Sequence, residues 1–404
     1  MNALPRPIAR VIVDRPVPQP LDYLLPESGA ESPPVIGTRC IVPVGRVRVA
    51  GILVGLADSS PIEPRRLRRV AQFLEGTRVS RLWLDFCRFA ADYYHCGWGE
   101  IALPALPQRL RRAPGVRAGR AAPATGATPA GSGDDPGTLA AGAGPLRGEQ
   151  IECIEAIRAA RGFARFLLFG ITGSGKTEVY LGAIESTLAR SPGAQVLLLV
   201  PEINLTPQLE ARLRARFGEQ EIVLLHSSMT GLERDRAWMA AHEGRARILV
   251  GTRMAIFASL PGLALVIVDE EHDASFKSSS GAAWSARDLA VKRAQLHEVP
   301  VVLGSATPCL ETWQQARAGR YRVLSLHERG AGGAPAPPRV ETVDLRTDPG
   351  TKGLTAALRT AIDGSLARGE QVLVFLNRRG FAPVLCCAAC GWLCLLYTSP
   401  SPRD

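Results

Sequence analysis

The stretch Gly170-Ile171-Thr172-Gly173-Ser174-Gly175-Lys176-Thr177 decides the fold of this chain. It fits the pattern G-x-x-x-x-G-K-[ST] at every fixed position. An apolar run, Phe166–Phe169, precedes it as a predicted strand, and a helical pattern follows it, which is the context that the motif requires. The glycines let main-chain N–H groups close around phosphate oxygens, and the helix N-terminus adds a favourable dipole. The stretch therefore predicts a phosphate-binding loop in which Lys176 reaches the β/γ-phosphates and the Thr177 hydroxyl binds Mg²⁺.

Short apolar runs alternate with helical stretches on both sides of this loop. A helix is expected over Gly148–Ala160, and further strands are expected at Gln195–Val200, Ile222–Leu225, Ile248–Val250, Leu263–Val268 and Val301–Leu303. Near-continuous runs of Val, Ile and Leu are typical of strands that are covered on both faces. Alternation of such strands with helices predicts an α/β fold, a doubly wound parallel sheet with helices on both faces.

Two further motifs lie in this region. Asp269-Glu270-Glu271-His272 ends the apolar run that begins at Leu263, so Asp269 is placed to hold Mg²⁺ through water and Glu270 to orient and deprotonate an attacking water. The alternative is an acidic strand-to-helix cap. Gly304-Ser305-Ala306-Thr307-Pro308 follows the last predicted strand, and its hydroxyls are candidates for sensing the nucleotide through the Asp269–Glu270 carboxylates. A Ser/Thr helix cap before Leu310 is the competing interpretation.

The flanking regions have other compositions. Residues 1–75 contain short apolar runs cut by Pro and Gly, at Val11–Val13, Arg39–Val44 and Ala50–Val54, and predict a small β-rich domain. Ser80–Tyr94 has the spacing of an amphipathic helix. Residues 111–145 are Ala, Gly, Pro, Ser and Thr with almost no large apolar side chain, which predicts a flexible linker. After a Gly/Ala/Pro stretch, a helix over Thr355–Ala367 and a strand over Gln371–Phe375 begin a second α/β unit.

The charge and the apolar runs bear on partners and location. The 404 residues carry a formal net charge of +10, and a basic surface favours a polyanionic partner, nucleic acid above all. A GC-rich genome that favours Arg codons is the alternative explanation. No apolar run reaches the ~18 residues that a membrane span needs. The first residues contain no apolar segment typical of a secretory signal. We therefore expect a cytoplasmic protein without a membrane partner.

Lysine and cysteine usage add two observations. The chain has only four lysines, Lys176, Lys277, Lys292 and Lys352, so the one in the phosphate loop is among the few that Arg has not replaced. Five of the nine cysteines are scattered, which is typical of small buried side chains. The other four cluster near the end, at Cys386, Cys387, Cys390 and Cys394, and clustering in a cytosolic protein indicates metal rather than disulfides.

The motifs together resemble a known family. A phosphate loop, D-E-x-H and S-A-T in this order and spacing are similar to lobe 1 of a RecA-like superfamily 2 helicase. Finer resemblance is to the primosomal protein N′ (PriA) family of replication-restart helicases. It is carried by Pro201–Gln208, by Leu225–Ser228 with Glu233, Arg234 and Trp238, by Val250–Arg253, and by Asn377–Leu385. Leu146–Gln150 resembles the glutamine motif that reads adenine, which implies that role for Gln150.

The resemblance also implies DNA-binding and metal residues. Pro20–Leu24 and Gly37–Gly45 resemble the family's domain for a DNA 3′ end, so Asp22 and Tyr23 are expected in the pocket for the terminal nucleotide; a turn Asp and a core Tyr are the alternative. Gly251, Thr252 and Arg253 are expected along the DNA path. Phe276 and Trp284 resemble the family's aromatic-rich loop, and His272, Ser305 and Thr307 are expected to couple ATP to DNA. Cys387 and Cys390 resemble half of a zinc motif, which needs two more ligands.

The implied activity is ATP-driven 3′→5′ DNA unwinding at stalled or abandoned forks to restart replication. ATP and Mg²⁺ are the expected cofactors, with Zn²⁺ in the full-length protein. Forked or 3′-ended DNA, primosome proteins and single-stranded DNA-binding protein are the expected partners. The alternatives are a DNA-structure-binding module that binds ATP without unwinding, and a P-loop kinase or transporter ATPase, against which the S-A-T motif argues.

The expected organisation is a 3′-end-binding domain at 1–110, the linker at 111–145, lobe 1 at 146–330 and the start of lobe 2 at 331–392. Three departures from the family accompany it. The winged-helix domain is missing, and the middle of the aromatic-rich loop has become Ser278–Ala283. The tail at 393–404 does not resemble the family, and we expect it to be an artefact or part of an incomplete gene product. A chain without a complete lobe 2 is expected to be inactive or weakly active alone.

Overall fold

The computed structural model describes residues 7–26, 34–111, 145–171, 173–201, 207–218, 221–278, 281–328, 339–348 and 354–375, with a few positions beyond. The chain divides into two compact units, Met1–Ala334 and Pro335–Asp404. The predicted linker falls almost entirely outside the described residues, as do most of Pro201–Gln208 and of Asn377–Leu385.

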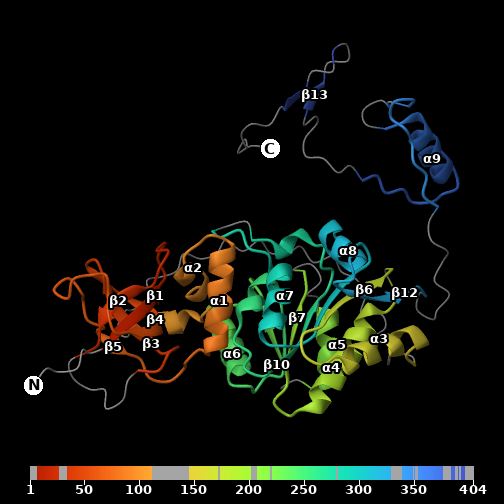
Figure 1. The fold of residues 1–404 in the computed structure, drawn as a ribbon. Helices are drawn as coiled ribbons and strands as arrows, with labels where there is room; N and C mark the ends of the chain where they lie inside the picture. The colour runs from red at the N-terminus through yellow and green to blue at the C-terminus, as the bar shows by residue number, and fades with distance from the viewer. Residues whose placement is uncertain are drawn as a thin grey trace, which may run out of the picture. The chain divides into compact units, whose positions relative to one another are not determined.

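A five-stranded antiparallel sheet opens the first unit (Figure 1). Its strands lie in the order β2-β1-β4-β3-β5. Their bounds are β1 Ile8–Val13, β2 Leu21–Leu24, β3 Arg39–Val44, β4 Val47–Ala57 and β5 Gln72–Phe73. Residues Ala9, Val11 and Val13 point to one side of β1 and pack with Tyr23, Cys40, Val42 and Leu53 in a small core. The predicted β-rich domain is present, and β2 and β5 were not expected.

Two helices follow this sheet, α1 Arg81–Tyr93 and α2 Trp98–Ala102, and a 3-10 turn covers Gln108–Arg111. Helix α1 begins at Arg81 because the Ser80 hydroxyl accepts a hydrogen bond from the Trp83 N–H at 3.1 Å. The buried face of α1 carries Trp83, Leu84 and Phe86. These side chains pack against the α/β lobe as well as against the N-terminal sheet.

A seven-stranded sheet, parallel throughout, forms the centre of the first unit, as the sequence predicts. The order is β12-β6-β11-β10-β7-β9-β8. The strands are β6 Arg165–Gly170, β7 Gln195–Leu199, β8 Ile222–Leu225, β9 Ile248–Gly251, β10 Leu263–Val268, β11 Val301–Ser305 and β12 Arg322–Leu326. The last of these was not predicted.

Alternate residues of these strands point into two separate cores, which makes the sheet doubly wound. On one face Leu168, Val196 and Ile267 pack with α3 Gly148–Ala159, α4 Lys176–Arg190 and α5 Pro207–Phe217. On the other face Leu167, Leu197 and Val266 pack with α6 Gly231–His242 and α7 Ala286–Leu296. Helix α8, Leu310–Arg317, follows β11.

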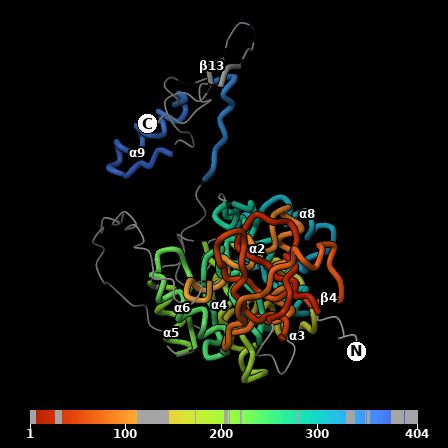
Figure 2. Tube along the Cα trace, turned by 90° about the vertical axis from the view of Figure 1, so that its left-hand side faces the viewer, coloured from red at the N-terminus to blue at the C-terminus, as the bar shows by residue number. Residues whose placement is uncertain are grey.

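Helix α1 shares this second core, so the N-terminal sheet and the α/β lobe are joined by packing rather than only by chain connection. Figure 1 shows α1 between the N-terminal strands and α7, and in Figure 2 the N-terminal domain faces the viewer in front of the lobe. The Phe86 and Phe257 ring centroids lie 5.6 Å apart, and the Trp83 indole N–H donates to the Phe257 carbonyl at 2.7 Å. Each large apolar side chain buried in this way contributes roughly 1.5–3 kcal/mol.

The second unit contains α9, Ala356–Ala367, and an antiparallel pair, β13 Val384–Cys386 with β14 Leu393–Leu395. The predicted strand at Gln371–Phe375 is wrong: these residues are not in a strand, and Leu373 and Phe375 are 93% and 80% exposed. An apolar run becomes a strand only when a neighbouring strand pairs with it, and none does so among the described residues. Helix α9 likewise has no buried residue among those described.

Candidate nucleotide-binding site

The phosphate-binding loop lies between β6 and α4, at the carboxyl edge of the parallel sheet. Gly173 and Gly175 have φ of +80° and +85°, a left-handed conformation that glycine adopts without strain. Gly175 is also confined by Gln150, because a Cβ there would lie 2.3 Å from the Gln150 amide nitrogen. The Lys176 ammonium is nearly buried and donates to the Gly170 carbonyl at 3.0 Å. The loop therefore holds its lysine against its own main chain, directly beside the start of α4.

The Asp269–Glu270 pair lies directly opposite, after the central strand β10. The Lys176 ammonium is 3.6 Å from a Glu270 carboxylate oxygen. Asp269 accepts a hydrogen bond from the Tyr180 hydroxyl at 2.9 Å and from the Glu270 N–H at 3.0 Å. Burial raises the pKa of Asp269 above its ordinary value, while the Tyr180 hydrogen bond acts in the opposite direction. The parallel strands β6 and β10, which are separated by β11, thus bring together the predicted catalytic residues Lys176, Asp269 and Glu270 at one edge of the sheet.

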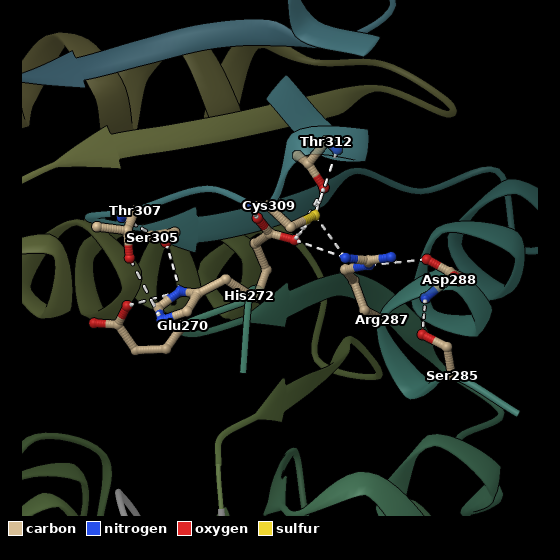
Figure 3. Close-up of polar contacts among 10 residues, drawn as sticks. Glu270, His272, Ser285, Arg287, Asp288, Ser305, Thr307, Cys309 and Thr312 are labelled. Atoms are coloured by element: carbon tan, nitrogen blue, oxygen red, sulfur yellow. Dashed lines mark hydrogen bonds and ion pairs between the residues drawn. The ribbon is translucent and has the colours of Figure 1, made fainter. Parts of the chain in front are cut away.

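The third motif follows β11 and contacts the second through a histidine (Figure 3). His272 Nδ1 lies 2.8 Å from the Ser305 hydroxyl and 3.7 Å from a Glu270 oxygen, and its Nε2 lies 3.5 Å from the Thr307 hydroxyl. Ser305 also accepts the Thr307 N–H at 2.9 Å. His272, Ser305 and Thr307 are therefore brought together, although the hydroxyls contact the histidine and not the carboxylates that the sequence suggested.

The residues present fit a Mg²⁺-bound nucleoside triphosphate. The Ser174 hydroxyl is buried in the loop with no hydrogen-bond partner among the described residues, so an acceptor is missing where phosphate oxygens are expected. The buried Asp269 carboxylate is a hard oxygen ligand of the kind that Mg²⁺ prefers. Thr177 opens α4 beside Lys176, and its side chain is half-buried.

Gln150, which the resemblance assigns to adenine, contacts the main chain at Arg147 and at Gly175 of the phosphate loop. It is buried; its amide oxygen accepts the Arg147 N–H at 2.9 Å and its amide nitrogen donates to the Gly175 carbonyl at 3.3 Å. Both ends of the amide are engaged by the chain itself, so in this structure Gln150 supports the phosphate loop. The adenine contact implied by the resemblance would require the amide to change partners.

Of the predicted DNA-path residues, Gly251 ends β9, and Thr252 and Arg253 follow it at the same edge of the sheet. Thr252 is buried, Arg253 is half-buried, and a Cβ on Gly251 would lie 2.5 Å from the Leu225 carbonyl oxygen. A cavity of about 260 Å³ adjoins them. The residues His226, Arg234, Trp238 and Arg111 also line this cavity, so segments that carried the sequence resemblance meet here.

The two aromatic residues expected to contact DNA are in the core instead. Phe276 and Trp284 are 2% and 6% exposed, and the Trp284 ring lies edge-on to Phe257 at 5.0 Å between centroids. Burial of large apolar rings is favourable by itself, and it leaves neither ring accessible to a base. This part of the prediction is not supported by the structure.

The expected 3′-end pocket is divided between surface and core. The Tyr23 ring is 4% exposed, its hydroxyl donates to the Pro43 carbonyl at 3.1 Å, and burial raises its pKa to about 12. It is therefore a core tyrosine that cannot stack on a nucleotide. Asp22 lies 3.7 Å from the Arg10 guanidinium and lines a cavity of about 850 Å³ between the N-terminal sheet and α1.

No group of three or more metal-ligating side chains occurs in the part of the chain that the structure describes. Cys390 is exposed, and Cys387 lies outside the described residues, so the predicted zinc pair has no structural support. Within the same described ranges, no helix is long and apolar enough to cross a membrane.

Three residues near the site were missed from the sequence. Tyr180, one turn into α4, reaches Asp269; Glu271 and Cys309 join the second and third motifs. Tyr180 sits four residues after Lys176 on the face of α4 that meets the sheet, so helical spacing offered a weak signal. Nothing in the spacing of Glu271 and Cys309 indicated that their side chains meet.

Comparison with known proteins gives two family matches. Residues 10–107 match the 3′DNA-binding domain (3′BD) described for PriA, and residues 147–316 match the DEAD/DEAH box helicase family. The first covers the N-terminal sheet with α1 and α2, and the second covers the phosphate loop and both further motifs. A DEAD/DEAH box domain implies an ATP-dependent enzyme with Mg²⁺.

Curated relatives match both regions at once. The chain is 33% identical over 449 aligned residues to the replication restart protein PriA of Haemophilus influenzae, which covers 96% of this chain and 60% of that protein. It is 37% identical to the PriA of Treponema pallidum, covering 89% of this chain and 52% of that protein, and 40% identical to that of Bacillus subtilis, covering 62% and 31%. The chain thus spans about a third to three fifths of the length of these relatives.

Proposed function

Because this chain is a homologue of the PriA replication restart proteins, we propose that it carries the DNA-end-binding and ATP-binding parts of an ATP-dependent 3′→5′ DNA helicase that restarts replication at stalled or abandoned forks. The observation that supports this most directly is the convergence of Lys176, Glu270 and Asp269 beside the His272–Ser305 contact. A P-loop kinase would not need the third motif at this edge.

The residues divide the chemistry among them. Lys176 and Thr177 would hold the phosphates and Mg²⁺, and Asp269 would hold Mg²⁺ through water. Bound ATP with Mg²⁺ supplies a terminal phosphoanhydride whose hydrolysis is strongly favourable. Glu270 orients the attacking water and accepts its proton. The distance of 3.6 Å between the Glu270 carboxylate and the Lys176 ammonium supports this division of roles.

DNA is the proposed partner of the N-terminal domain, and the cavity beside Asp22 is the proposed place for a 3′ end. Arg81 and Arg88 of α1 line the same cavity in ion pairs with Asp85 and Asp92, at 3.4 and 3.7 Å, so a bound phosphate would take the place of these carboxylates. Arg253 and the cavity at His226 and Arg234 lie on the proposed path for the strand across the lobe. Primosome proteins and single-stranded DNA-binding protein belong to the same proposal.

The test combines two titrations of the chain. Forked DNA with a free 3′ hydroxyl is compared with the same fork carrying a 3′ phosphate, in wild type, Asp22→Ala and the exposed control Asp14→Ala. ATP turnover is measured with and without the fork, in wild type and Lys176→Ala. We expect Asp22→Ala alone to lose the preference for the free end, and Lys176→Ala alone to abolish the weak turnover expected of the wild-type chain.

Two outcomes would contradict the proposal in different ways. End preference without any DNA-stimulated turnover would leave a DNA-structure-binding module. Turnover that ignores DNA, together with equal binding to both forks, would remove the helicase assignment.

A further inference from the structure

Glu271 is a buried carboxylate in the second motif that the chemistry proposed above does not use. It is 1% exposed, yet it has no metal or phosphate role to explain its burial. A buried charge is costly unless hydrogen bonds and an opposite charge compensate it. Glu271 has both kinds of partner. Its oxygens accept the Cys309 N–H at 2.8 Å and the Thr312 hydroxyl at 2.9 Å, and the Arg287 guanidinium lies 3.5 Å away.

The first two partners belong to the N-terminus of α8, directly after the third motif. Cys309 is the N-cap residue of this helix and Thr312 lies in its first turn. A carboxylate at this point satisfies a free N–H and interacts favourably with the helix dipole. The Glu271 N–H also donates to the Gly304 carbonyl at 3.0 Å. Glu271 therefore forms hydrogen bonds to the third motif on both sides, to Gly304 before Ser305 and to Cys309 after Thr307.

The third partner extends the cluster to α7 (Figure 3). Arg287 contacts the Cys309 sulfur at 2.6 Å and the Asp288 carboxylate at 2.9 Å. The N-cap residue of α7, Ser285, donates its N–H to the Tyr94 hydroxyl at the end of α1 at 3.1 Å. A continuous set of polar contacts and main-chain links thus runs from the second motif to a helix of the N-terminal domain.

The residue before Glu271 has a backbone conformation that its neighbours must hold in place. Glu270 has φ of +45°, in the left-handed region that non-glycine residues avoid. Such a conformation costs roughly 1–3 kcal/mol and persists only where its surroundings impose it. The Asp269 N–H is fixed to the Leu199 carbonyl at 2.9 Å on one side, and Glu271 is fixed to the third motif on the other.

We propose that Glu271 is a positioning residue: its buried carboxylate holds Glu270 in its strained conformation and keeps the third motif in register with it, while Arg287 ties this pair to α7 and α1. The role rests on the proposed ATP hydrolysis for its functional part, and on the contacts of Glu271 for its structural part. Glutamine at this position keeps an acceptor for the Cys309 N–H but leaves Asp288 as the one carboxylate partner of Arg287 in the contacts described, so it is the conservative variant.

The experiment measures binding and hydrolysis separately in Glu271→Ala, Glu271→Gln and the surface control Glu243→Gln, which pairs only with Arg245 in the contacts described. Affinities for fluorescent ATP and ADP with Mg²⁺ are compared with single-turnover hydrolysis in the presence of forked DNA. Hydrogen exchange is followed in peptides covering Gly304–Arg317 and, as a reference, α4. We expect nucleotide affinities to change less than twofold in all variants. Hydrolysis is expected to fall at least tenfold in Glu271→Ala and about threefold in Glu271→Gln, with faster exchange confined to Gly304–Arg317.

Equal hydrolysis in wild type and Glu271→Ala overturns the inference. A parallel loss of ADP binding also overturns it, because that pattern indicates damage to the lobe rather than lost positioning. If the wild-type chain does not hydrolyse ATP, as the sequence leads us to expect of a chain without a complete lobe 2, the exchange data alone decide the inference. Exchange at Gly304–Arg317 that is unchanged in Glu271→Ala then refutes it, and a confined increase supports it.

Discussion

The variant Tyr180→Phe removes one hydroxyl from α4, the helix that follows the phosphate loop. It tests whether this hydroxyl keeps Asp269, the proposed Mg²⁺ ligand, ionised. The Tyr180 hydroxyl donates to Asp269 at 2.9 Å, and only the Glu270 N–H, at 3.0 Å, remains as a donor to that oxygen in the described contacts. A hydrogen bond to a charged group contributes about 1.5–3 kcal/mol. Because one donor remains, we take the lower end, which corresponds to about a tenfold change in an equilibrium constant.

The direction follows from the charge on Asp269. Burial raises the pKa of Asp269, and the Tyr180 hydrogen bond opposes that rise, so the variant should raise the pKa further. Mg²⁺ binds the ionised carboxylate. The affinity for nucleotide with Mg²⁺ should therefore weaken about tenfold at neutral pH, and the loss of binding on acidification should begin at a higher pH than in wild type.

The assay is a titration with fluorescent ATP, in Mg²⁺ and in EDTA, at several pH values. The matched control is Tyr23→Phe, which deletes a hydroxyl from another buried tyrosine, in the N-terminal sheet, where it donates to the Pro43 carbonyl. Only Tyr180→Phe should change the difference in ATP affinity between Mg²⁺ and EDTA. The reasoning is refuted if affinity in Mg²⁺ is unchanged, or if affinity in EDTA falls by the same factor.

Two further changes probe buried charges. Asp269→Asn removes a carboxyl whose pKa is raised in the folded chain, so the folded chain holds this proton more tightly than the unfolded chain does. The contribution of the protonated carboxyl to stability is lost as pH rises through the folded pKa. Without Mg²⁺ the variant should therefore melt at a higher temperature than wild type at pH 8 and by a smaller margin at lower pH, and an equal margin at every pH contradicts this. Arg293→Met removes a cation that is 1% exposed, donates to the Ile256 and Ala258 carbonyls, and has its pKa lowered to about 10 by burial. Because removal of the buried charge offsets part of the lost hydrogen bonds, urea unfolding should show a free energy of unfolding lower by about 2 kcal/mol. An unchanged midpoint would show that the two carbonyls find other donors.

The sequence predicted the lobe because periodicity and one loop motif specify it locally. Strands such as Leu263–Val268 are continuous apolar runs, and parallel topology places the ends of β6, β10 and β11 at one edge whatever the side chains between them. Lys176, Asp269 and Glu270 converge for that reason. The strand expected at Gln371–Phe375 failed because an apolar run specifies a strand only if a partner strand is present.

Side-chain placement was predicted less well, since composition does not say which way a ring points. The family resemblance assigns Tyr23, Phe276 and Trp284 to DNA, but the same rings are large apolar groups that can fill a core. Gln150 is similar: its amide suits adenine, and it equally suits the main chain of the loop that lies beside it. Such assignments depend on tertiary contacts that no spacing rule contains.

The buried aromatic residues also change the account of how DNA and ATP are connected. Phe276 and Trp284 do not point outward to meet a strand; they pack with Phe257, whose carbonyl accepts a hydrogen bond from Trp83 of α1. The segment between the second motif and α7 is therefore fixed to the N-terminal domain from inside. A DNA end that moves α1 would act on α7, and through Arg287 and Glu271 on the third motif, without any aromatic residue touching a base. Packing at α1, rather than exposure of the loop, therefore connects the two proposed binding sites.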